Sequence, residues 1–172
     1  MHMVEGGRWF LVASDISYFD LEASDPTETT LIPEQFQGKS STKVTMATDF
    51  DSDASFLTFN LVVSYCLIVR PVPDFKEHRI QIWKVSLTLD DHQRGVGLAA
   101  EHLASFPQEL SIRRVWALSL RGSHLALSGF CSEYNEPRRT FVIDWKRADG
   151  DSTNYSRRLL HPCYGPVCGH SI

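Results

Sequence analysis

The clearest pattern of hydrophobic and polar positions is a strict alternation over residues 78–89. One side carries Ile80, Ile82 and Lys84, and the other carries Gln81, Trp83, Val85 and Leu87. Successive side chains of a β-strand point to opposite faces of its sheet. The alternation therefore predicts a strand, the clearest one in the chain.

Two further segments need a choice between strand and helix. Residues 56–63 are almost continuously apolar, which is typical of a strand covered on both faces. Residues 98–106 have helical propensity, but Gly97 and Pro107 frame only nine positions. Because so short a helix is marginal, we predict a strand there as well.

The remaining apolar runs are short and separated by Gly, Pro, Asp or Asn, as in antiparallel β-proteins. Asp15 separates the first two so closely that they should form a hairpin. Pro33 should end an edge strand, because proline cannot donate to a ladder. The further predicted strands are residues 8–14, 16–21, 29–32, 43–49, 113–120, 124–130, 140–145 and 155–160.

These strands repeat. Residues 8–13, 54–59 and 123–128 each open the second strand of a unit, and residues 16–21, 80–85 and 140–145 form the third. Such a repeat favours an all-β fold of antiparallel four-stranded blades. We predict an incomplete β-propeller, WD40-like or kelch-like, of about two and a half to three blades over residues 1–160, followed by an irregular tail over 161–172. The alternatives are a plain meander with coincidental spacing, or a sandwich.

Composition places the 172-residue chain among globular proteins, with 42% hydrophobic and 22% charged residues. The net charge of −4 argues against nucleic-acid binding, which needs a basic face. Acidic residues interrupt the one basic cluster, which consists of Arg138, Arg139, Lys146, Arg147, Arg157 and Arg158.

The N-terminus lacks the basic and apolar regions of a signal peptide. The longest apolar run, residues 61–69, is far shorter than the roughly 20 residues of a membrane span. Four cysteines are too few for a disulfide framework. These features predict an intracellular protein, cytoplasmic or nuclear, that binds no membrane.

Two clusters could in principle bind metal. Asp49, Asp51 and Asp53 begin like a calcium loop, but Ala54 and Asn60 replace the required Gly and Glu, so a solvated hairpin turn is favoured. Another cluster, Cys163, Cys168 and His170, has soft zinc ligands but no second pair at a standard spacing. We expect neither a metal nor a cofactor.

The sequence gives little support for a catalytic site. Ser123 and His124 are adjacent, but alternation should point them to opposite faces. The run Gly95-Val96-Gly97 lacks the third glycine and the strand–helix context of a phosphate loop. We therefore predict a non-enzymatic protein without catalytic residues.

The four tryptophans lie in or beside predicted strands, where packing between blades is the expected role. An exposed tryptophan would instead be a partner anchor, and the pattern does not separate the two roles. These residues are Trp9, Trp83, Trp116 and Trp145.

Five runs carry a resemblance to a known family: GGRWFLV at 6–12, IQIWKVSL at 80–87, DDHQRGVGL at 90–98, LASFPQ at 103–108 and VIDWKRADGDS at 142–152. Together they resemble the propeller-like C-terminal region of F-box proteins expanded in mushroom-forming fungi. The resemblance implies a substrate receptor of a cullin–RING ubiquitin ligase, in which the propeller holds the protein target. The F-box helices that dock on the ligase adaptor would lie upstream of Met1, so adaptor binding needs a longer form.

We therefore predict a protein–protein interaction module. The alternatives are a lectin-like ligand-binding β-protein that uses exposed aromatic residues and, less favoured, a hydrolase that uses Ser123 and His124.

Overall fold

The computed structural model describes residues 2–4, 6–13, 16–32, 44–68, 76–108, 112–131, 139–148 and 157–160. In these segments the regular structure is β-strand, with one 3₁₀ turn at Trp145–Arg147 and no α-helix. Within the same ranges, no helix has the length and apolar character to cross a membrane. The prediction of an all-β fold is confirmed.

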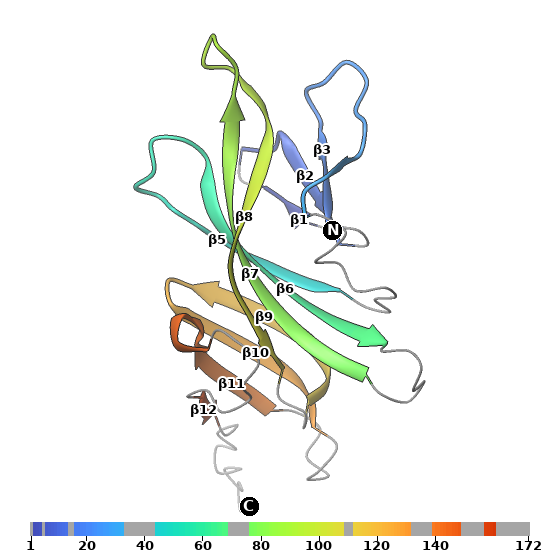
Figure 1. Ribbon diagram of the computed structural model, residues 1–172, viewed down its shortest axis with the longest axis vertical. Helices are drawn as coiled ribbons and strands as arrows, with labels where there is room; N and C mark the ends of the chain where they lie inside the picture. Colours follow the sequence, from blue (N-terminus) through green and yellow to red (C-terminus); the bar gives the residue numbers. More distant parts are fainter. Residues whose placement is uncertain are drawn as a thin grey trace, which may run out of the picture.

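The strands form three antiparallel four-stranded sheets, each a simple meander in chain order (Figure 1). The N-terminal sheet contains β1 (His2–Met3), β2 (Trp9–Val12), β3 (Ser17–Asp20) and β4 (Thr29–Thr30). The central sheet contains β5 (Thr45–Phe50), β6 (Thr58–Ile68), β7 (Lys76–Leu89) and β8 (Gly95–Pro107). The C-terminal sheet contains β9 (Ile112–Arg121), β10 (His124–Cys131), β11 (Arg139–Asp144) and β12 (Arg157–Leu160).

The predicted repeat coincides with this topology. Two of the segments expected to open second strands lie at β2 and β10, whereas residues 54–59 reach β6 only with Thr58 and Phe59. The segments expected as third strands lie at β3, β7 and β11. Residues 98–106 belong to strand β8, as predicted. Strand β8 has two extra residues relative to β7, Val96 and Leu103, which mark β-bulges.

Some element predictions were wrong. Strand β1 was missed because two residues carry no readable alternation. Trp145 opens the 3₁₀ turn instead of ending a strand. Phe56 belongs to the turn before β6. Asp49, predicted both as the last residue of strand 43–49 and as part of the turn after it, belongs to strand β5. The predicted loops at 70–74 and 133–137 and the tail at 161–172 lie outside the described residues.

The hydrophobic core has two layers, one on each face of the central sheet. The layer shared with the N-terminal sheet contains Phe59, Leu61, Val63, Trp83 and Val85 from β6 and β7. On the opposite face, Val62, Ile80 and Ile82 pack against the C-terminal sheet. The alternation read in residues 78–89 therefore separates the side chains of these two layers. Residues 59–63 of β6 contribute to both layers, as predicted for a strand covered on both faces.

The first strands of neighbouring sheets are linked by polar contacts. His2 Nε2 of β1 and Thr48 Oγ1 of β5 lie 2.9 Å apart. Asp49 Oδ2 of β5 accepts a hydrogen bond of 2.7 Å from the backbone N–H of Gly122, directly after β9. The three meanders therefore stack in chain order with their first strands adjacent.

Candidate protein-binding face

Turns of neighbouring sheets lie beside one another, because one hollow is lined by the β1–β2 and β5–β6 turns and another by the β5–β6 turn and the end of β9. We call these turns and the β9–β10 turn, together with the β7–β8 turn and the segment after β3, the turn face. Arg8, at the start of β2, donates a hydrogen bond of 2.9 Å to the carbonyl of Gly95, at the start of β8. Trp145 Nε1 donates at 2.8 Å to the carbonyl of Gly122 in the β9–β10 turn. The first contact links the N-terminal and central sheets, and the second holds the β9–β10 turn against the end of β11 within the C-terminal sheet.

The β5–β6 turn is the centre of the turn face. Asp51 Oδ1 accepts a hydrogen bond of 3.1 Å from the N–H of Asp53, and the N–H of Asp51 donates to the carbonyl of Thr58. Such Asx contacts stabilise a turn without help from other elements. The turn carries Phe56, whose side chain is 53% exposed. Phe56 is thus an exposed apolar side chain on a turn that hydrogen bonds hold in place.

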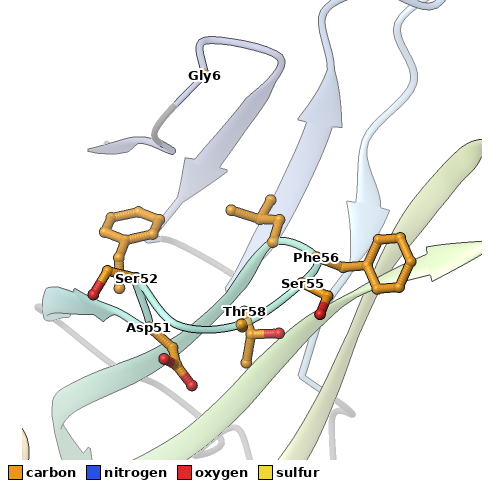
Figure 2. A pocket seen from close by; sticks show the side chains of 9 residues that line it. Gly6, Asp51, Ser52, Ser55, Phe56 and Thr58 are labelled. Atoms are coloured by element: carbon orange, nitrogen blue, oxygen red, sulfur yellow. The ribbon is translucent and has the colours of Figure 1, made fainter.

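A hollow of about 510 Å³ lies beside this turn, between it and the β1–β2 turn (Figure 2). Gly6 overhangs it, and both Gly6 and Gly7 have positive φ, a conformation that glycine adopts without steric cost. The side chains that line the hollow mix apolar, hydroxyl and carboxylate groups: Phe50, Asp51, Ser52, Ala54, Ser55, Phe56, Leu57 and Thr58.

A second hollow, of about 560 Å³, lies on the other side of the same turn and reaches the C-terminal sheet. Phe50 and Ser52 line both hollows, while Ser119 and Arg121 of β9 line only the second. The β5–β6 turn is therefore a ridge between the two hollows. A partner protein or an extended peptide could pack against a surface of this shape.

The turn face also carries pairs of charged side chains. Arg8 forms a bidentate ion pair with Asp20 through Nε (2.9 Å) and Nη2 (2.6 Å). Glu22 Oε2 lies 3.6 Å from Arg8 Nε. The hydrogen bond from Arg8 holds the pKa of Asp20 below its ordinary value, and the same bond raises the pKa of Arg8. In the β7–β8 turn, hydrogen bonds from Arg94, through its backbone N–H and its guanidinium, lower the pKa of Asp90.

The three aspartates considered as a calcium loop have different structural roles. Asp49 lies in β5, where it contacts Gly122 and Arg121, so its prediction as part of a solvated turn was wrong. Asp51 organises the β5–β6 turn, and Asp53 supplies the N–H that it binds. Across the described ranges, no group of three or more potential metal ligands comes together. The candidate zinc ligands Cys163, Cys168 and His170 lie outside those ranges.

Ser123 and His124 were expected to point apart, and that expectation was wrong. Ser123 belongs to the turn before β10, where strand alternation does not apply, and its Oγ lies 3.3 Å from His124 Nδ1. A nucleophilic pair also needs a third group that orients the base. In the described part of the chain, no carboxylate hydrogen-bonds to His124. The contact is a side-chain pair in an exposed turn.

The structure separates the four tryptophans. Trp9, Trp83 and Trp145 are buried in the two core layers, whereas Trp116 of β9 is 44% exposed. The members of the basic cluster do not gather around the hollows, because Arg157 and Arg158 lie on β12 and Lys146 and Arg147 lie in the 3₁₀ turn. Arg147 Nε also lies 3.3 Å from Asp144 Oδ2. Arg138 lies outside the described residues.

Sequence reasoning missed the turn face itself. Phe56 was placed in a strand because an aromatic residue preceded an apolar run. The polar run Asp51-Ser52-Asp53-Ala54-Ser55 was the available signal that the turn continues that far.

Comparison with known proteins adds no constraint on the site, because no family model, curated protein or solved structure matches this chain.

Proposed function

We propose that this chain is a non-enzymatic protein–protein interaction module that binds a protein target through the turn face. The observation that carries the proposal is the β5–β6 turn, which lies between two hollows of about 510 and 560 Å³ and carries the exposed aromatic residue Phe56 at the first of them. Aromatic residues surrounded by polar groups are the usual anchors of protein interfaces. Binding residues also tend to lie on turns held by a rigid scaffold.

The proposed architecture is an incomplete β-propeller in which the three sheets are blades. Each sheet is an up-and-down meander of four strands, and first strands of successive sheets contact one another through His2–Thr48 and Asp49–Gly122. Propellers arrange such sheets around a central axis, with turns of the same type at one end. This arrangement explains why turns of three sheets meet at the turn face.

The resemblance to F-box proteins of mushroom-forming fungi suggests a more specific role, the recognition of substrates for a ubiquitin ligase. In that role the target binds the blades, inside the cell, in the cytoplasm or nucleus. Contact with the ligase adaptor requires F-box helices. The five runs that carry the resemblance are structural rather than catalytic motifs, so they support a shared architecture more directly than a shared target.

The experiment that tests the proposal is site-specific photocrosslinking in lysate. A photoreactive phenylalanine analogue at position 56 should crosslink to a discrete protein. The matched control carries it at Glu101, an exposed residue on strand β8. Phe56→Ser should reduce recovery of the same protein at least tenfold in a pull-down, whereas Glu101→Ser should not. Equal crosslinking from both positions, or recovery unaffected by Phe56→Ser, would refute binding at the turn face.

A lectin-like function is the second candidate, and the first hollow favours it. The hollow combines the ring of Phe56 with the hydroxyls of Ser52, Ser55 and Thr58 and the carboxylate of Asp51. An apolar wall with a few polar groups is what small-ligand sites require. A glycan array probed with the natural chain and with Phe56→Ala tests the lectin-like function. Binding that is lost in Phe56→Ala would support it, and no binding by the natural chain would rule it out.

A further inference from the structure

The second hollow, between strand β5 and the end of β9, has a largely covered carboxylate in its wall. Only 11% of the Asp49 side chain is exposed. Asp49 Oδ2 accepts the hydrogen bond of 2.7 Å from the N–H of Gly122, whereas Oδ1 lies 3.5 Å from Arg121 Nη1. That second distance is longer than an ordinary N–H···O hydrogen bond. Asp49 Oδ1 is therefore able to accept a shorter bond from a cation that comes closer.

Arg121 is a weakly held partner for this carboxylate. Its side chain is 91% exposed, in contrast to that of Asp49. Ion pairs of exposed side chains contribute little to stability, because water and salt screen them and because a long side chain loses conformational freedom when it is held. Little free energy therefore opposes the movement of the Arg121 guanidinium out of the hollow.

The rest of the second hollow offers acceptors, apolar surface and room. The hydroxyl oxygens of Ser52 and Ser119 have lone pairs that accept hydrogen bonds. Phe50 and Leu120 supply apolar surface, against which the aliphatic stem of a lysine or arginine packs well. The volume of about 560 Å³ lies within the range of ligand sites. The lining thus fits a side chain with an aliphatic stem and a cationic end.

The ridge beside this hollow carries negative charge that is not neutralised. Asp51 and Asp53 are exposed in the β5–β6 turn, and among the described residues no cation forms an ion pair with either. The other arginines of the turn face, Arg8 and Arg94, each pair with an aspartate of their own. Such a surplus of one sign attracts a group of the opposite charge and repels a group of the same charge.

We propose that the second hollow receives a lysine or arginine side chain of the protein target, whose cation takes the place of Arg121 at Asp49 Oδ1. The proposal rests on the proposed function and names the chemistry of the partner, a protein segment with a basic residue that packs beside the Phe56 ridge. Charge-assisted hydrogen bonds to a covered carboxylate are stronger than those between exposed groups, so the exchange favours the incoming cation. An acidic side chain bound by Arg121 is the alternative, and it would have to approach Asp49, Asp51 and Asp53.

Titration of the ¹⁵N-labelled chain with small side-chain probes, followed by amide NMR, tests the proposal. The N-acetyl methylamides of arginine and lysine should shift the Gly122 amide signal with a Kd in the millimolar range. The aspartate counterpart should leave that signal in place. Arg121→Ala should lower the Kd of the basic probes about threefold, because it removes the competing cation. Asp49→Asn keeps an acceptor for the Gly122 N–H but loses the charge, so it should raise that Kd about tenfold.

Matched variants elsewhere separate a specific site from general electrostatics. Arg147→Ala removes a guanidinium that is 80% exposed, and Glu101→Gln removes an exposed carboxylate from strand β8. Neither should change the Kd of the basic probes. A natural chain whose Gly122 signal responds to no basic probe overturns the proposal. So does an Arg121→Ala variant that binds the basic probes no better, or one that loses a response to the acidic probe.

The protein that crosslinks to position 56 supplies an independent result. Its recovery in a pull-down should rise with Arg121→Ala and fall with Asp49→Asn. Equal recovery by both variants, together with loss in Phe56→Ser, would leave the turn face as the binding surface and refute the basic contact. A chain that crosslinks to no protein at position 56 would refute the proposed function, and the probe titration would then decide alone whether the second hollow binds a basic side chain.

Discussion

The hydroxyl of Tyr18, in strand β3, accepts a hydrogen bond of 3.2 Å from the backbone N–H of Leu98, in strand β8. The two residues are eighty positions apart and belong to different sheets. The contact is possible because Gly97 leaves room for the hydroxyl, since a Cβ atom at position 97 would lie 2.8 Å from Tyr18 Oη.

The first prediction concerns this close approach. Gly97→Ala should destabilise the protein by about 1–3 kcal/mol, because a buried tyrosine cannot move aside without strain. Tyr18→Phe alone should cost about 1–3 kcal/mol, because the Leu98 N–H loses its partner. In the double variant the hydroxyl that would clash with a Cβ atom at position 97 is absent. Its loss of stability should therefore be smaller than the sum of the losses in the two single variants. Urea unfolding of the four proteins measures this coupling, and strict additivity would contradict the contact.

The second prediction is a pH dependence of the Arg8–Asp20 pair. The pKa of Asp20 is lowered in the folded protein, so its ionised form stabilises the fold above the ordinary aspartate pKa of about 3.9. That contribution is lost as the pH falls through the lower, folded-state pKa. The stability deficit of Arg8→Ala should therefore be larger at pH 7 than at pH 2.5.

Part of the stability loss of Arg8→Ala should persist at low pH, because Arg8 also donates to the Gly95 carbonyl and lies 4.5 Å from the ring centre of Trp9. The urea midpoint measured across this pH range checks the prediction. Arg94→Ala is the control, because its ion pair with Asp90 stays within one exposed turn. A deficit of Arg8→Ala that does not change between pH 7 and pH 2.5 would show that the ion pair contributes nothing.

The third prediction concerns Asp49, which joins the central and C-terminal sheets. Its side chain is 11% exposed, and Asp49→Ala removes the acceptor for the Gly122 N–H. Hydrogen bonds to charged groups contribute about 1.5–3 kcal/mol, so a loss of that order is expected.

Two matched variants test whether the Gly122 contact is the cause. Asp51→Ala affects an exposed turn, and Arg121→Ala removes a side chain that is 91% exposed. Each should cost less than about 1 kcal/mol. Chemical denaturation of all three variants gives the comparison. An Asp51→Ala variant as unstable as Asp49→Ala would assign the effect to local turn structure.

The fourth prediction contrasts two tryptophans. Trp145 is buried and donates to the Gly122 carbonyl, so Trp145→Ala should cost about 3–5 kcal/mol. Trp145→Phe, which keeps most of the apolar volume, should cost about 1–2 kcal/mol. Trp116→Ala changes a half-exposed side chain at a bulge and should cost about 1 kcal/mol or less. Thermal unfolding followed by circular dichroism ranks the three, and any other order would contradict the assigned burial.

The strand pattern was predictable because alternation is a local property. Residues 78–89 and 56–63 showed which side chains share a face, and the structure places their buried apolar side chains in the two core layers. The repeat of second and third strands was equally readable, since each strand pairs with its neighbour in the chain. Strand β1 was too short to show any period, and Phe56 was assigned by its type instead of by the polar run before it.

The candidate site was not predictable in the same way. Phe56, Gly6 and Arg121 border the hollows from three different sheets, and nothing in their local sequence indicates that they are neighbours. The same holds for Asp49, whose partners are 72 and 73 positions further along the chain. Strand alternation was also misapplied at Ser123, which lies in a turn.

By itself, the sequence determined that this protein is built from antiparallel strands in three successive units, because the period of two and the turn residues act over a few positions. Only the tertiary structure decided which tryptophan is exposed, which aspartate joins two sheets and where the hollows lie. Those outcomes depend on how one sheet packs on the next, and that packing is set by side chains far apart in the chain.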